Sequence, residues 1–65
     1  MKVRYGDKEF AFDQRMPARK LLEQLSILPE TVVVTKNEEI VTEDEMLEVD
    51  DEVELIRVIS GGTGN

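Results

Sequence analysis

The sequence is marked first by two absences. Its 65 residues include no cysteine and no histidine. Without cysteine the chain forms neither disulfides nor thiolate metal sites, and without histidine it lacks the commonest general base and metal ligand. No apolar run approaches the roughly 20 residues that cross a bilayer. We therefore expect no bound metal, no bound cofactor and no association with a membrane.

The chain also has little room for an active site of its own. A domain of 65 residues buries only about 60% of the surface that its unfolded chain exposes, so an enclosed pocket would consume the core. Hydrophobic residues make up 40% and charged residues 35% of the chain, which is typical of a globular protein. The first residues do not resemble a secretory signal. These features predict a cytoplasmic carrier, binding module or subunit rather than an enzyme.

Negative charge is concentrated in the second half of the sequence. Residues 1–36 carry seven basic and five acidic side chains, whereas residues 37–65 carry ten acidic side chains and one base, Arg57. Phosphate is repelled by such a field, so we expect no direct binding of nucleic acid. Charge complementarity favours a basic protein partner, although acidic surfaces also serve solubility alone. The acidic segment 43–52 lacks the spacing and glycine of an EF-hand calcium loop.

The first residues predict a β-hairpin. Polar and apolar side chains alternate over residues 2–5 and 9–13, which is the period of strands that bury one face. Gly6 lies between the two segments and can adopt the positive φ that a tight turn often requires.

A helix is expected next, because the apolar period changes from two to between three and four. Pro17 suits the first turn of this helix, Asp13 is a candidate cap, and Pro29 ends the pattern. One helical face is lined by Ala18, Leu21, Leu22 and Leu25.

The second half of the chain predicts three more strands. Residues 31–35 are β-branched, residues 36–38 form a turn, and residues 39–42 form a short strand. Residues 53–59 form the last and strongest strand. The acidic segment between these strands is anchored by Met46, Leu47 and Val49.

This element order, ββαβββ, predicts an α+β fold with one helix across a mixed sheet of four to five strands. Residues 1–60 would form the domain and residues 61–65 a flexible tail without side chains that pack. The expected core consists of Val3, Tyr5, Phe10, Phe12, Leu21, Leu22, Leu25, Val32, Val34, Ile40, Leu47, Val53 and Leu55.

The last strand also predicts a docking surface. If Val53 and Leu55 face the helix, the alternation of strand side chains places their neighbours on the open face of the sheet. A small exposed apolar patch is a recognition signal, but these residues could equally be strand formers or cover a homodimer interface. The candidate docking residues are Val33, Ile56, Arg57, Val58 and Ser60.

Gly61 and Gly62 follow this strand. A chain end that enters another enzyme's narrow channel must be thin and extended, and glycine offers no side chain to clash there. Two glycines would place a reactive carbonyl clear of the folded body, although an ordinary flexible terminus has the same composition.

The chain resembles the ubiquitin-like (β-grasp) sulfur carriers, the ThiS/MoaD-like family of thiamine, molybdopterin and tRNA-thiolation pathways. The resemblance rests on the element order and on residues 28–34, 36–41, 50–56 and 60–62, and it covers the chain up to Gly62. It implies that a ubiquitin-activating-type adenylyltransferase uses ATP to adenylate the Gly62 carboxylate. Sulfur then replaces AMP, and the thiocarboxylate delivers sulfur to an acceptor enzyme's substrate.

The sequence departs from the simplest members of this family, which end at the second glycine. Here Thr63-Gly64-Asn65 follows, so a processing protease is expected to remove these three residues. The alternatives are a relative that no longer uses its tail and a remnant of cloning. Two other functions remain open: a protein modifier that forms isopeptide bonds to lysine, and a non-catalytic acidic interaction module.

Overall fold

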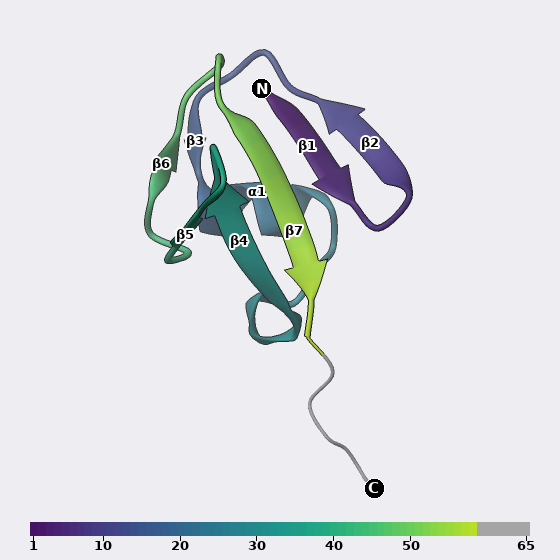
Figure 1. Ribbon diagram of the computed structural model, residues 1–65. Helices are drawn as coiled ribbons and strands as arrows, with labels where there is room; N and C mark the ends of the chain where they lie inside the picture. Colours follow the sequence, from purple (N-terminus) through teal and green to yellow (C-terminus); the bar gives the residue numbers. More distant parts are fainter. Residues whose placement is uncertain (59–65) are drawn as a thin grey trace, which may run out of the picture.

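The computed structural model describes residues 1–58, which form a five-stranded mixed sheet with the strand order β2-β1-β7-β4-β5 (Figure 1). Strand β7 is central and runs parallel to β1 but antiparallel to β4. The outer strands β2 and β5 each form an antiparallel hairpin with their neighbour. The strands are β1 (Lys2–Tyr5), β2 (Lys8–Ala11), β4 (Val32–Lys36), β5 (Glu39–Val41) and β7 (Glu52–Arg57).

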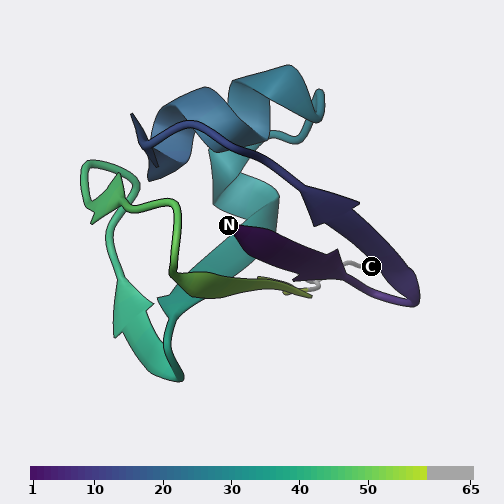
Figure 2. The same ribbon diagram turned by 90° about the horizontal axis from the view of Figure 1, so that it is seen from above.

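Helix α1 (Ala18–Gln24) covers one face of this sheet (Figure 2). Its stripe of apolar residues is buried at Ala18, Leu21 and Leu22, whereas Leu25 is only partly buried against the core. Among residues 1–58, no helix lies on the opposite face of the sheet. These features confirm the predicted α+β class with one helix across a mixed sheet.

Both hairpin turns use the left-handed backbone region. Gly6 has a φ of 63°, as its position in the first turn predicts. In the turn between β4 and β5, Asn37 and Glu38 have φ values of 52° and 74°. Positive φ at both central residues is the type I′ arrangement, whose twist matches that of the strands it joins. Asparagine tolerates this region, but glutamate is strained there.

Two short strands were not predicted. Strand β3 (Met16–Pro17) and strand β6 (Met46–Leu47) pair with each other as a separate two-stranded sheet. Because Met16 and Pro17 are extended, the helix begins at Ala18 rather than in the predicted first turn around Pro17. Pro17 itself occupies the N-cap position and no side chain caps the helix, so Asp13 precedes the helix without capping it.

A 3₁₀ turn, η1 (Pro29–Thr31), connects the helix to β4. It removes Thr31 from the predicted strand, while the predicted end at residue 35 extends to Lys36. The last strand, predicted at 53–59, ends at Arg57 among the described residues. No helix in residues 1–58 is long and apolar enough to cross a membrane.

The core differs from the prediction at a few positions. Ile40 was expected inside but is 77% exposed, because its neighbour Val41 pairs with Val34 on the helix side. The anchors expected in the acidic segment are reduced to one: Leu47 is fully buried, whereas Met46 and Val49 are exposed. The expected core also lacked four residues that are buried, of which only Ala18 had been placed on the apolar helical face: Met1, Met16, Ala18 and Thr35.

Candidate functional site

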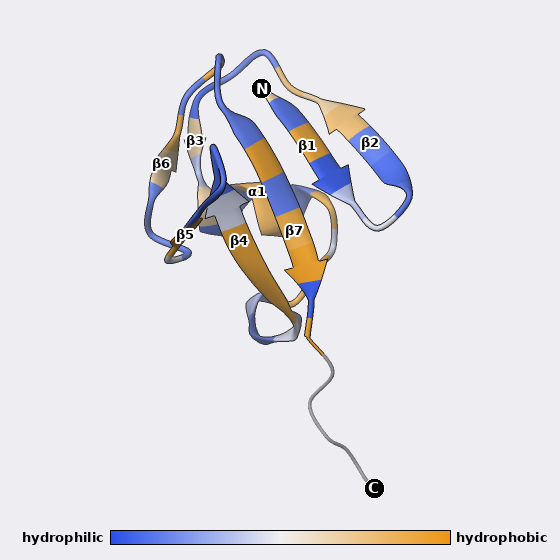
Figure 3. Ribbon diagram, in the orientation of Figure 1, coloured by the Kyte–Doolittle hydropathy of each residue, from blue (hydrophilic) through white to orange (hydrophobic). Residues whose placement is uncertain are grey.

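In the central strand β7, hydrophobic Val53 and Leu55 alternate with acidic Glu52 and Glu54 (Figure 3). Three residues of the sequence separate the end of β7 at Arg57 from Gly61. Val53 and Leu55 are 3% and 2% exposed beneath the helix. Ile56 and Val58 remain 44% and 41% exposed. This confirms the predicted alternation, and it places apolar surface where the chain leaves the fold.

The register of β4 extends this surface sideways. Val33 lies directly opposite Ile56 across the antiparallel pair, and its side chain is half-buried. Arg57 lies opposite Val32 and is exposed. The structure therefore brings Val33 and Ile56 together on the open face. Of the other predicted site residues, Ser60, Gly61 and Gly62 lie outside the described residues.

The end of β7 is attached to η1 rather than projecting alone. The amide of Val58 donates a 2.9 Å hydrogen bond to the carbonyl of Thr31. Thr31 in turn donates from its amide and its hydroxyl to the carbonyl of Leu28, over 3.0 and 2.6 Å. We call Thr31, Arg57 and Val58 the tail root, because residues 59–65 start there. The hydrogen bonds give this starting point a defined position beside η1.

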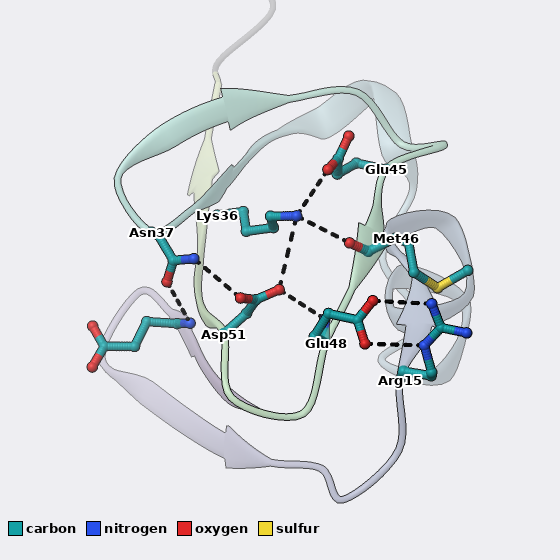
Figure 4. A network of polar contacts seen from close by, with 8 residues as sticks. Arg15, Lys36, Asn37, Glu45, Met46, Glu48 and Asp51 are labelled. Carbon is teal, nitrogen blue, oxygen red and sulfur yellow. Dashed lines mark hydrogen bonds and ion pairs between the residues drawn. The ribbon is translucent and has the colours of Figure 1, made fainter.

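A polar network occupies the other end of β7 (Figure 4). Lys36 donates to Glu45 over 2.8 Å and to the carbonyl of Met46 over 3.2 Å. Asp51 accepts from the amide of Glu48 over 2.7 Å and from the side-chain amide of Asn37 over 3.1 Å. These contacts hold the acidic segment against the β4–β5 turn.

The network shifts the protonation equilibria of its members. Hydrogen bonds from the Glu48 amide and the Asn37 side chain hold the pKa of the Asp51 carboxyl below its usual range. The hydrogen bond with Glu45 raises the pKa of Lys36. Arg15 makes two 3.0 Å hydrogen bonds to the carboxylate of Glu48, whose pKa is lowered by that contact. Several acids of this segment therefore stabilise the fold through contacts within the chain.

Residues 1–58 offer no arrangement for metal binding: no three acidic side chains in them are grouped to hold an ion. The perturbed carboxylates already have protein partners, and none lies at the tail root. Within residues 1–58, the candidate site is therefore the surface around the tail root.

One exposed residue beside this site was missed from the sequence. Leu28 is 62% exposed, and its carbonyl is bonded to Thr31 at the tail root. From the sequence, Leu28 belongs to the segment 28–34 that carries part of the family resemblance, and no predicted surface included it. Its neighbour Ile27 packs partly against the core instead. The helical spacing of apolar residues, which would continue from Leu25 to Leu28, therefore does not hold in this turn.

Comparison with known proteins decides the family. The family model described as the ThiS family matches residues 2–62. The chain belongs to the ThiS family. The sulfur carrier protein TtuB of Thermus thermophilus is 38% identical over 55 residues, which cover 85% of each chain. This membership confirms the predicted recognition of a ThiS/MoaD-like carrier rather than an enzyme.

Solved structures of a thiamine biosynthesis protein (ThiS) from Geobacter metallireducens share the fold of this ThiS-family chain. A crystal structure covers 95% of this chain and 100% of its own, with a TM-score of 0.67 and 23% identity. A solution structure covers 95% and 88%, with a TM-score of 0.63 and 23% identity. At this identity the likeness concerns the fold alone, and it confirms the predicted β-grasp.

Proposed function

We propose that this chain carries sulfur as a thiocarboxylate on Gly62. The observation that carries the proposal is the extent of the family match, which runs to Gly62 and stops before Thr63. The preceding strand is central in the sheet and ends in an exposed surface. The chain also lacks histidine and cysteine, so the catalytic groups belong to partner enzymes.

The proposed chemistry starts from the free carboxylate of Gly62. Thr63-Gly64-Asn65 blocks it, so a protease first hydrolyses the bond between Gly62 and Thr63. A ubiquitin-activating-type adenylyltransferase then joins the carboxylate to AMP from ATP and releases pyrophosphate. Hydrosulfide then attacks the acyl carbon, the bond to AMP breaks, and sulfur replaces one carboxylate oxygen without a change of oxidation state. Adenylation is required because the carboxylate alone has no good leaving group.

The acceptor belongs to a thiamine or tRNA-thiolation pathway in this proposal. The relative from Thermus thermophilus is named as a sulfur carrier, and the structural neighbour from Geobacter metallireducens is named as a thiamine biosynthesis protein. The docking surface for partner enzymes comprises Val33, Ile56, Arg57 and Val58, with Ser60 beyond the described residues. Cytoplasmic location remains part of the prediction.

Intact-mass spectrometry of the protein recovered from its native host tests this function. We expect a mass ending at Gly62, with a fraction of molecules carrying sulfur in place of one oxygen. Gly62→Trp should abolish sulfur loading without changing the circular dichroism spectrum, whereas Gly64→Trp should leave loading intact. A mass that always retains Thr63-Gly64-Asn65 would contradict the carrier function and favour an interaction module. Higher-mass conjugates would instead indicate a protein modifier.

A further inference from the structure

The short distance between the fold and Gly62 limits how a partner can approach. Four peptide units lead from Val58, the last described residue, to Gly62. Fully extended, they span at most about 14 Å. An enzyme that works on the Gly62 carboxylate must therefore bring its catalytic centre within that distance of Val58. Its surface then lies against the residues that surround the tail root.

Leu28 is one of these residues. Its carbonyl is linked to the Val58 amide through the two hydrogen bonds of Thr31, so these atoms are no more than about 10 Å apart. The side chain of Leu28 is 62% exposed, and η1 holds its backbone in place. Exposed leucine beside a chain exit is available for contact without a conformational change.

Two hollows that share Pro29 lie beside Leu28 and Val33, and the first is also bordered by charged side chains, among them Arg19, Lys20 and Glu23. Leu28 and Pro29 line a groove of about 880 Å³ along the helix side. Pro29 also lines a second hollow, of about 420 Å³, together with Val33. Val33 pairs with Ile56 on the open face. Pro29 thus connects the groove on the helix side with the hollow that contains Val33.

Charge at the tail root is low compared with the rest of the chain. Arg57 and Glu30 are the charged residues of β7's end and of η1, and their charges are opposite. The acidic segment that holds the Lys36 network lies at the start of β7, which is the other end of this strand (Figures 1 and 4). An apolar partner surface therefore fits the tail root better than a strongly basic one.

Resting on the function proposed above, we propose that Leu28 and Pro29 form a second docking surface for the adenylating enzyme. The apolar mouth of the channel that receives Gly62 contacts the open face through Ile56 and Val58. The same mouth reaches around the tail root to Leu28 on the helix side. The enzyme thus contacts the tail root from both sides of the sheet, and these contacts align the residues that follow with the channel.

ATP–pyrophosphate exchange by the host's ubiquitin-activating-type adenylyltransferase tests this surface. The substrate is the chain ending at Gly62, which retains all described residues 1–58. Leu28→Ser should raise the apparent KM for the carrier about tenfold, because the apolar contact would be lost. The kcat should change less than about twofold, since binding rather than the chemical step is affected. Leu28→Met should restore the KM.

Val49→Ser is the matched control, because Val49 is also apolar and 44% exposed but precedes the start of β7. It should leave the KM unchanged. If Leu28→Ser has the same KM as the unsubstituted carrier, and the unsubstituted carrier supports normal exchange, the proposed docking surface at Leu28 and Pro29 is wrong but the proposed carrier function is unaffected. Equal increases for Leu28→Ser and Val49→Ser would also overturn it. Absence of exchange with the parent itself would remove both proposals.

Discussion

Val33 and Ile56 lie directly opposite each other on β4 and β7. They occupy the sheet face that the helix leaves open, and Ile56 lies two residues before Val58, the last described residue. Val33 is half-buried, and Ile56 is 44% exposed. Ile56 is therefore the more accessible member of the pair.

Ile56→Ser should weaken adenylation through binding. We expect the apparent KM for the carrier to rise about tenfold, because one apolar side chain is lost from the docking surface. Ile40→Ser is the control, since Ile40 is another exposed strand isoleucine, on the edge strand β5. ATP–pyrophosphate exchange measures both variants. A parental KM for Ile56→Ser would show that the open face is not the docking surface.

Asp51→Asn should reveal a pH-dependent contribution to stability. The folded-state pKa of Asp51 lies below its usual value, so its carboxylate stabilises the fold above about pH 4 and loses this effect as pH falls through the lowered pKa. The unfolding midpoint of Asp51→Asn should be below that of the parent at pH 7, and the difference should shrink towards pH 3.

Asp50→Asn is the matched control for this experiment. Asp50 is exposed and has no ion pair or side-chain hydrogen bond within residues 1–58. Its replacement should change the midpoint little at either pH. Urea denaturation at both pH values measures these differences. An Asp51→Asn deficit of the same size at pH 3 would exclude the carboxylate charge as its source.

Leu47→Ala should be severely destabilising although β6 has only two residues. Leu47 is fully buried, and a buried leucine truncated to alanine costs about 2–5 kcal/mol. The adjacent Met46 is 37% exposed, so Met46→Ala should cost less than about 1 kcal/mol. Chemical denaturation followed by circular dichroism measures both. Equal losses would mean that β6 does not pack as described.

Glu38→Gly should stabilise the protein. Glu38 has a φ of 74° in the β4–β5 turn, and relief of left-handed strain is offset only in part by the extra flexibility of unfolded glycine. The resulting Asn-Gly pair is the preferred type I′ sequence. We expect a gain of up to about 1 kcal/mol in the free energy of unfolding, whereas Glu39→Gly in β5 should lower it. A loss on Glu38→Gly would indicate that the Glu38 side chain stabilises the turn.

Much of the fold could be predicted because local patterns and burial agree. The alternation of Val53, Leu55 and Ile56 is preserved in β7, since a strand with one covered face must alternate. Gly6 has the expected positive φ, and Asn37 lies in the turn predicted over residues 36–38. The position of the glycine pair after a final strand also comes from the order of residues. The role of Gly62 remains a proposal.

Only the tertiary structure decided the remaining features. Strands β3 and β6 are two residues each, too short to show a period, and they exist because Met16 and Leu47 meet across the chain. Ile40 is apolar like a core residue, but its pairing with Thr35 places its side chain on the sheet face away from the helix. Leu28 gained its place beside the tail root through the hydrogen bonds of Thr31. Residue order sets local preferences and periods, whereas contacts between distant segments depend on how the elements pack.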